Sequence, residues 1–473
     1  MSHKLQQTVI YIVLALLSVM LTACGEQYTS GNGTAEWADA SASSAVSSDA
    51  ISDNTVSEDE ARLEEAEKIL TDLKEDIPES VSDAQAVSGD TVEKKRFIPQ
   101  PTHFITDAGY SAALSYTKDA DLHRLASVMK KAERGEDLTI GLIGGSITQG
   151  VAAEGRLDKK VEDPQYYANI FFDWWKSYYP DISIKNVNAG IAGTDSYLGL
   201  HRAYEDLLHE KPDLVVVEYS VNDKNDLVHE KSYEHLVRNI LSMENSPAVI
   251  LLFMAETDGT SAMITHKKTG DYYRLPMLSY ADAMKRMMAD GRYSAGDLSG
   301  DRLHPSVMGH AMIGELLWRY LNEVYENADL ITDTEDTWEL PKAFTPGNYD
   351  RARFLHGDEL YAEQKGSFTY GTDNWAFKEG YTSLAGNGGI SFKAEFANLG
   401  ISYIQRGRAD MALFDVYVDG VYKATLNGRT RVELVAADVE IYTSDKRAEH
   451  TVTIYRNPAS YGGRIEITGL LTS

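Results

Sequence analysis

The 473-residue chain contains a single cysteine, Cys24, and few basic residues for its number of acidic ones. One thiol cannot form an intramolecular disulfide, and it excludes a zinc site built on cysteines. Lysine and arginine total 45 against 72 aspartates and glutamates, which makes the formal net charge −27. This excess of negative charge disfavours binding to nucleic acid or to anionic lipid headgroups, because both would repel the chain.

Long apolar runs are also scarce. An uncharged, mostly apolar run at residues 8–23 follows a basic start with Lys4, but it is shorter than the roughly 20 apolar residues of a membrane-spanning helix. Its ending, Leu21-Thr22-Ala23-Cys24-Gly25, resembles a bacterial lipoprotein lipobox. We therefore expect residues 1–24 to be a lipoprotein signal peptide. Cys24 would be lipidated and would anchor the protein to the extracytoplasmic side of the cell membrane. A spanning anchor, or a signal peptide with a chance cysteine, is the alternative.

The remaining chain divides by composition into three parts. Residues 25–96 are rich in Ser, Ala, Asp and Glu with few aromatics, so they bury too little apolar surface to fold alone, and we interpret them as a tether. Residues 97–330 alternate strand-like and helical patterns. Residues 331–473 carry short alternating runs of β-branched and aromatic residues.

Alternation in the second part predicts a mostly parallel sheet with helices on both faces, an α/β fold. The expected strands are 138–143, 182–187, 214–218, 249–254 and a weaker 274–277. The expected helices are 166–178, 196–209, 233–243, 280–289 and 305–325, the last with Pro305 in its first turn.

The first strand stops at Gly144-Gly145-Ser146. A serine at the carboxyl end of a parallel strand lies where open α/β sheets keep their ligands, and the glycines leave room for a substrate. Ser146 is therefore a candidate nucleophile, although turn serines are common. A P-loop is excluded because Val151 and Ala152 stand where it needs Lys and Ser/Thr, and Thr148 replaces the second glycine of a nucleophile elbow.

A serine nucleophile needs a base held in one tautomer by a third group. Asp301-Arg302-Leu303-His304-Pro305 offers both, since a carboxylate three residues before His304 can reach one ring nitrogen and leave the other free. Two other strand ends offer donors for an oxyanion, Gly193 through its backbone N–H and Asn222 through its amide. Taken alone, each of these residues is more typical of a turn, a helix cap or the plain surface than of a catalytic site.

In order and spacing, these four segments resemble the blocks of the SGNH (GDSL-like) hydrolase superfamily. The resemblance covers about residues 135–327 and implies a three-layer α/β/α, flavodoxin-like fold and ester hydrolysis through an acyl-serine. It implies that Ser146 is the nucleophile, His304 the general base and Asp301 its orienting partner. The N–H groups of Ser146 and Gly193 and the side chain of Asn222 would form the oxyanion hole.

One position departs from the family pattern. Gly145 stands where the name-giving Gly-Asp-Ser-Leu form has an acidic residue, which bears on subfamily and substrate rather than on activity. Glu218 and Asp223 flank the Asn222 segment and receive no firm role. No cofactor is expected, and no metal, since His304 and His310 lack companion ligands at metal spacing.

The carboxyl-terminal runs predict an antiparallel sandwich that looks like the jelly-roll modules of carbohydrate esterases. An Asp419-Gly420 pair predicts a tight hairpin turn. The expected strands are 390–396, 399–405, 414–418, 421–426, 432–435 and 450–455. Four tyrosines are candidates for stacking on sugar rings, with a place in the core as the alternative: Tyr403, Tyr417, Tyr422 and Tyr455.

The sequence thus favours a lipid-anchored serine esterase that removes acetyl or similar acyl groups from a polysaccharide or a smaller acylated molecule. A lipid or aryl esterase on the same residues is one alternative. A glycan-binding surface lipoprotein with a relic hydrolase domain is another, and the intact Ser146, His304, Asp301 and Asn222 argue against it. The particular polymer, the oligomeric state and the type of cell envelope stay open.

Overall fold

The computed structural model describes residues 103–152, 155–156, 166–333, 338–347, 349–374, 376–407, 410–430, 434–460 and 463–473. These residues all belong to one unit that spans residues 95–473. The predicted signal peptide with Cys24 and the predicted tether lie outside the described residues.

A five-stranded parallel sheet forms the first domain, with the order β4-β1-β5-β6-β7. The strands β5 and β6 are buried along their whole length, as expected of a sheet covered on both faces. Their apolar, β-branched composition explains both the strand and its burial. The five strands are β1 (Leu138–Gly144), β4 (Ile184–Gly190), β5 (Leu214–Glu218), β6 (Ala248–Phe253) and β7 (Met277–Ser279).

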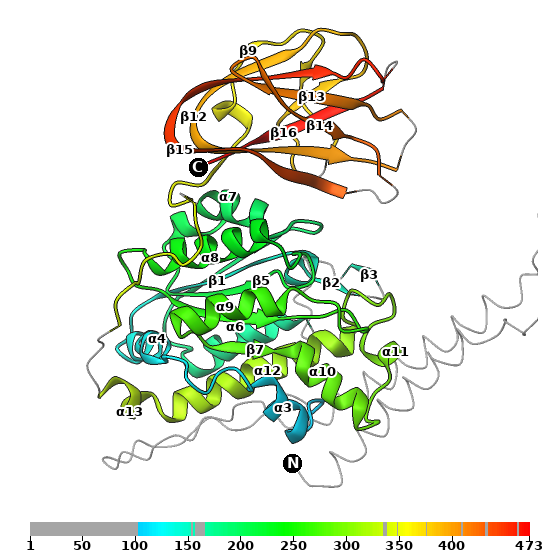
Figure 1. The fold of residues 1–473 in the computed structure, drawn as a ribbon. Helices are drawn as coiled ribbons and strands as arrows, with labels where there is room; N and C mark the ends of the chain where they lie inside the picture. Colours follow the sequence, from blue (N-terminus) through cyan, green and yellow to red (C-terminus); the bar gives the residue numbers. More distant parts are fainter. Residues whose placement is uncertain are drawn as a thin grey trace, which may run out of the picture. The chain divides into compact units, whose positions relative to one another are not determined.

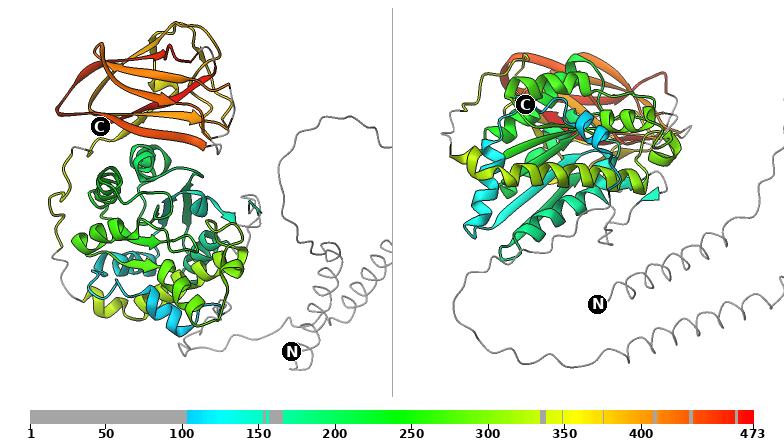
Figure 2. Two further views of the ribbon diagram at one scale, coloured as in Figure 1. Left: turned by 45° about the vertical axis from the view of Figure 1, so that its right-hand side comes forward. Right: turned by 90° about the horizontal axis from the view of Figure 1, so that it is seen from below.

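Helices cover both faces of this sheet (Figures 1 and 2). Alternate residues of β5 face opposite ways: Leu214 and Val216 join the core under α4, α6, α10 and α12, whereas Val215 and Val217 join the core under α7 and α8. The predicted three-layer α/β/α fold is confirmed. Its longer helices are α3 (Asp107–Ala113), α4 (His123–Glu133), α6 (Tyr167–Tyr178), α7 (Ser196–Asp206), α8 (Leu227–Leu241), α9 (Met263–Tyr273), α10 (Tyr280–Ala289) and α12 (Val307–Glu326).

Caps correct the predicted boundaries of two helices. The Asp226 side chain accepts the backbone N–H of His229, so α8 begins at Leu227, six residues before the predicted start. Ser306 caps α12 in the same way, so Pro305 lies before that helix rather than in its first turn. The sequence patterns did not predict α3, α4 or α9.

The second domain is an antiparallel β sandwich, as predicted (Figure 1). The predicted strands 390–396 and 399–405 are one strand, β12, with an irregularity between Phe396 and Asn398. Likewise 450–455 and the described part of 432–435 are the two ends of one strand, β15. Its strands are β8 (Arg353–Leu355), β9 (Ala362–Gln364), β10 (Thr369–Tyr370), β11 (Tyr381–Ser383), β12 (Ile390–Gln405), β13 (Leu413–Val418), β14 (Val421–Asn427), β15 (Leu434–Arg456) and β16 (Ile465–Thr472).

The hairpin between β13 and β14 turns at the predicted pair. Asp419 has φ 50° and Gly420 has φ 76°, the left-handed values that a tight two-residue turn requires. The last strand, β16, is buried along its whole length and was not among the predicted strands.

Apolar and charged contacts join the two domains. Tyr349, Phe354 and Leu471 share one core with Tyr197 and other residues of α7. The Lys231 ammonium lies 3.1 Å from a Glu440 carboxylate oxygen. Because part of the core is common to both, the sandwich is packed onto the helical layer that contains α7 and α8.

Candidate active site

Three neighbouring strand ends bring the predicted segments to one edge of the sheet. Gly144 at the end of β1 is in register with Gly190 at the end of β4 and with Glu218 at the end of β5. Ser146 follows the first of these strand ends, and Gly193 and Asn222 follow the other two. Arg202, fully buried, donates to the carbonyls of Gly144 and Ala189 at 3.0 and 2.7 Å and so fixes two of the strand ends.

Ser146 is the first residue of a one-turn helix, α5 (Ser146–Gln149), and is 5% exposed. Glycine is required at both positions before this turn. A Cβ at Gly144 would collide with Thr148 and with the carbonyl of Glu218, and a Cβ at Gly145 would collide with Asn222. The departure of Gly145 from the family pattern therefore has a local cause, because only glycine leaves room for the Asn222 side chain beside residue 145.

His304 stands between Ser146 and Asp301. Its Nε2 lies 2.9 Å from Ser146 Oγ, and its Nδ1 lies 2.6 Å from Asp301 Oδ2. The other oxygen of Asp301 accepts the backbone N–H of His304 at 2.7 Å. Partial burial would raise the pKa of Asp301, but the hydrogen bonds and charge of His304 outweigh it and lower that pKa. An ionised Asp301 can thus orient the ring with Nε2 toward the serine.

Ion pairs that the sequence patterns did not predict hold the loop that carries His304. Arg302 has φ 76°, a strained value for a residue with a side chain. Its guanidinium lies 2.7 Å from Glu256 and 3.2 Å from Asp258, on the loop after β6, and its carbonyl accepts the N–H of Thr257. The sequence features that could have predicted these ion pairs are the arginine inside the Asp-x-x-His motif and the two carboxylates just after the fourth strand of the sheet.

The two predicted oxyanion donors lie on adjacent loops. Gly193 has φ 73°, and the amide oxygen of Asn222 is buried beside Gly145. Asp223 joins these loops, because its carboxylate accepts the N–H of Ser196 at 2.7 Å and lies 2.8 Å from His266 Nε2. The structure therefore brings Ser146, His304, Asp301, Gly193 and Asn222 to one edge, and their catalytic roles remain predictions.

The buried carboxyl group of Glu218 holds the turn that carries Ser146. Glu218 accepts the hydroxyl of Thr148 at 2.9 Å and the backbone N–H groups of Gly145 and Thr148. Tyr167 donates to the same Thr148 hydroxyl at 2.8 Å. Complete burial raises the pKa of Glu218 to about 7, although these hydrogen bonds oppose the shift. Glu218 thus has a structural place, fixing the backbone on both sides of Ser146.

A cleft of about 520 Å³ opens beside Gly193 and Asn222. One wall comes from the first domain and includes Asp195 and His229. The other wall comes from the sandwich and includes Tyr403, Gln405, Asp438 and Glu440. Tyr403 is 6% exposed, whereas Tyr422 and Tyr455 are 53% and 44% exposed. The predicted sugar-stacking tyrosines therefore divide into one at the cleft and others on the sandwich surface.

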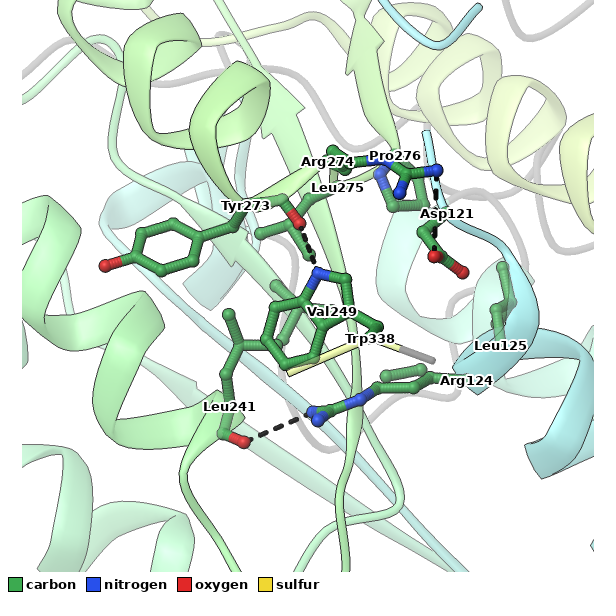
Figure 3. Close-up of a pocket in the computed structure, with 11 residues that line it drawn as sticks. Asp121, Arg124, Leu125, Leu241, Val249, Tyr273, Arg274, Leu275, Pro276 and Trp338 are labelled. Carbon is green, nitrogen blue, oxygen red and sulfur yellow. Dashed lines mark hydrogen bonds and ion pairs between the residues drawn. The ribbon is translucent and has the colours of Figure 1, made fainter. Parts of the chain in front are cut away.

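A second, much smaller pocket of about 20 Å³ lies at the opposite edge of the sheet (Figure 3). It adjoins Val249 at the start of β6 and Pro276 before β7. Trp338, from the connection between the domains, donates to the carbonyl of Tyr273 at 3.2 Å, and the Arg124 guanidinium lies 4.4 Å from its ring. This pocket is where the interdomain connection packs, at the sheet edge away from Ser146.

Within the described ranges, no cluster of three or more His, Cys, Asp or Glu side chains is arranged to hold a metal ion. Among the helices that the structure describes, none combines the length and apolarity of a membrane span.

Comparison with known proteins agrees with this geometry. Residues 142–312 match the GDSL-like Lipase/Acylhydrolase family. An acetylxylan esterase of Geobacillus stearothermophilus is 27% identical over 165 residues, which is 30% of this chain and 74% of that protein.

Two crystal structures of a two-domain esterase active on acetylated mannans resemble both domains of this chain. The structure co-crystallized with mannopentaose has a TM-score of 0.66 and 25% identity, and covers 77% of this chain and 97% of its own. The second structure has a TM-score of 0.64 and 26% identity, and covers 77% of this chain and 98% of its own.

Proposed function

We propose that this chain, which belongs to the SGNH hydrolase superfamily and is a carboxylic ester hydrolase, acts on an acetylated polysaccharide. It removes acetyl groups from that polymer through an acyl-serine intermediate. The observation that carries the mechanism is the aligned row Ser146, His304 and Asp301, with distances of 2.9 and 2.6 Å between successive partners. This row supplies a nucleophile, a base and an orienting carboxylate.

In the first half-reaction, His304 Nε2 takes the proton of the Ser146 hydroxyl while Oγ bonds to the ester carbonyl carbon. Negative charge collects on the former carbonyl oxygen, where the N–H groups of Ser146 and Gly193 and the amide of Asn222 would donate to it. The bond to the sugar oxygen then breaks, and His304 returns the proton to that oxygen. The products are a free sugar hydroxyl and an acyl-Ser146.

In the second half-reaction, a water molecule takes the place of the sugar alcohol. His304 accepts one proton from the water as its oxygen bonds to the acyl carbon, and the same oxyanion donors act again. The bond to Ser146 Oγ breaks, the proton returns to Oγ, and the acid leaves. Asp301 stays ionised throughout and stabilises the imidazolium that forms twice per turnover.

The cleft favours a sugar over a lipid as the alcohol part of the ester. Its walls carry carboxyl, amide and imidazole groups, among them Gln405, Glu440 and His229, which suit hydroxyl-rich ligands. The acetylxylan esterase and the mannan esterase named above act on acetylated polysaccharides, which supports the same substrate class here. A lipid or aryl esterase would need an apolar channel for its substrate.

The substrate assignment is tested with purified protein lacking residues 1–24. Ser146→Ala should lower kcat/KM for p-nitrophenyl acetate by about ten-thousandfold or more, whereas Ser242→Ala, an exposed serine at the end of α8, should not. Acetate release from acetylated mannan and acetylated xylan then reports the polymer. Equal rates for the parent and Ser146→Ala would refute the mechanism, and faster hydrolysis of octanoyl than acetyl esters would favour the lipid esterase.

We also propose that Cys24 carries a lipid and that residues 25–96 tether the enzyme outside the cell. The support is the lipobox-like ending and the tether composition. In a bacterial host, the full chain should incorporate labelled palmitate and partition into the membrane fraction, and Cys24→Ser should abolish both. Labelling that persists in Cys24→Ser would contradict the anchor.

The surface tyrosines of the sandwich are proposed as an auxiliary contact for the polymer. Tyr417 packs against Tyr422 and Tyr455 with ring centroids 5.8 Å apart in both pairs, and the last two are exposed. Replacing Tyr422 and Tyr455 by alanine should weaken retention on acetylated mannan in affinity electrophoresis without changing the rate on p-nitrophenyl acetate. Unchanged retention would assign these tyrosines to packing alone.

A further inference from the structure

Two carboxyl groups from different domains meet beside the predicted oxyanion loop. Asp195 follows Gly193 by two residues and caps α7, and Asp438 lies on β15 of the sandwich. Both side chains line the same cleft, where they form a hydrogen-bonding pair. Since ionised carboxylates only accept hydrogen bonds, one member of the pair must carry a proton.

Asp195 is the ionised member. One of its oxygens accepts the N–H of Leu198 at 3.0 Å, and the other lies 3.2 Å from His229 Nε2. Burial raises the pKa of Asp195, but the hydrogen bond and charge of His229 outweigh it and lower that pKa. Burial and the neighbouring charge of Asp195 raise the pKa of Asp438 well above its ordinary range. The proton therefore belongs to Asp438, which donates it to Asp195.

Asp195 lies at the end of the loop that carries Gly193, and this loop contacts the loop of Asn222. Two hydrogen bonds hold the end of the Gly193 loop: the Asp195 side chain accepts the N–H of Leu198 at 3.0 Å, and the N–H of Ser196 donates to Asp223 at 2.7 Å. Asp223 directly follows Asn222. A shift of Asp195 would thus move Gly193 directly and would disturb the loop of Asn222 through Asp223.

We propose that Asp438 is a positioning residue for ester hydrolysis: its carboxyl group, in the cleft beside the α7 cap Asp195, ties the sandwich to that cap and so holds the Gly193 N–H in place to stabilise the oxyanion. The inference rests on the proposed function, because it assigns a role within that mechanism. It makes the sandwich part of the active-site scaffold as well as a wall of the cleft.

Several charged groups surround this pair and set the sign of its pH dependence. They come from the loop after β5, from α8 and from β15 itself: Asp223, Lys224, Asp226, His229, Lys231 and Glu440. The titratable phenols of Tyr197 on α7 and Tyr403 on β12 also face the pair. Three of these charged groups are acidic and three are basic, since the aspartates around His229 raise its pKa to about 9. Loss of the Asp438 proton places a second negative charge beside the ionised Asp195, and the two carboxylates then repel each other.

The first test compares Asp438→Ala with Asp438→Asn, assayed on p-nitrophenyl acetate, which has no sugar to contact the cleft. We expect Asp438→Ala to lower kcat about tenfold with little change in KM, since a displaced oxyanion donor acts on the transition state. Asparagine can still donate to Asp195, so Asp438→Asn should recover most of that loss. Full activity of Asp438→Ala on this substrate would overturn the proposal.

Arg353→Ala is the matched control for domain attachment. Arg353 lies 3.2 Å from Glu205 of α7, so it also joins the domains, but outside the cleft. If Arg353→Ala lowers kcat as much as Asp438→Ala does, the effect belongs to docking in general and the specific role is refuted. A change confined to KM for acetylated mannan would likewise refute it, in favour of a direct substrate contact.

The second test is the pH profile, which a merely structural residue would not move. The kcat of the parent should fall as rising pH removes the proton of Asp438, and the profile of Asp438→Asn should extend to higher pH. Coincident profiles would overturn the inference. Its failure is distinguishable from failure of the esterase proposal, because Ser146→Ala tests that proposal separately. If Asp438→Ala does not fold, the Asn variant and its pH profile decide alone.

Discussion

Two segments of the first domain place an aspartate three residues before a histidine and make the same contacts between the two, yet their histidines differ in what they can do. In Asp301–His304 and Asp226–His229 the Nδ1 atom lies 2.6 and 2.7 Å from the carboxylate. That carboxylate also accepts the N–H of its own histidine, at 2.7 and 3.0 Å. The local sequence thus builds an oriented imidazole in both places.

The two histidines differ in the group beside Nε2, the ring nitrogen that faces away from this carboxylate. Nε2 of His304 lies 2.9 Å from a serine hydroxyl, whereas Nε2 of His229 lies 3.2 Å from the second carboxylate, Asp195. Burial would lower the pKa of His229, but the surrounding aspartates outweigh it and raise that pKa to about 9. An imidazolium cannot accept a proton at neutral pH. The group that faces Nε2, and not the Asp-x-x-His motif, therefore decides whether the histidine can act as a base or is fixed as a cation.

The largest expected difference is in turnover. His304→Gln should lower kcat on p-nitrophenyl acetate by about ten-thousandfold, because it removes the base. His229→Gln should cost about tenfold or less, because it only loosens the loop around Asp195. Steady-state kinetics of the two variants, checked for folding by circular dichroism, make the comparison. Equal losses would break the distinction.

The orienting aspartates should differ in the same direction but by less. Asp301→Asn should lower kcat by about a thousandfold, since the amide favours the wrong tautomer of His304. Asp226→Asn should change kcat less than about tenfold, because Asp195 still holds His229. The same ester assay reads both variants. A greater loss in Asp226→Asn than in Asp301→Asn would reverse the assignment of the two segments.

A pH-dependent stability effect comes next in size. A histidine with a raised pKa stabilises the fold below its unfolded pKa, and that contribution is lost as pH rises through the folded pKa. For His229 the loss falls between about 6.5 and about 9. His229→Gln should therefore cost up to about 3 kcal/mol at pH 6 and almost nothing above pH 9 in urea unfolding. A cost that does not change with pH would mean that His229 is neutral in the fold.

The fold was largely predictable because its signals are local. Buried runs such as 214–218 and the Asp419-Gly420 turn dictate a strand and a hairpin within a few residues. The predicted start of α8 was wrong because the cap at Asp226 extends the helix over a polar stretch that lacks the helical pattern. The prediction divided β12 into two strands because strand irregularities let the pairing continue across a polar interruption.

The site was predictable only in part. Ser146, His304 and Asp301 stand in recognisable segments, and the structure brings them together as the resemblance implies. Asp438 carries no such signal, because its meeting with Asp195 depends on how a separate domain packs. Charge patterns of that kind become visible only when long-range contacts are known.

The smallest expected effect concerns how each segment is held. Asp226 begins a helix, which fixes its backbone, whereas Arg302 holds φ 76° outside any helix through pairs with Glu256 and Asp258. Exposed ion pairs are each worth about 0.5 kcal/mol, so Arg302→Ala should lower kcat about fivefold, with partial rescue by Arg302→Lys. Leu227→Ala, the matching position after Asp226, should change kcat less than about twofold, because the helix and not the side chain sets that backbone. If both alanine variants behave alike, the ion pairs of Arg302 do not position His304.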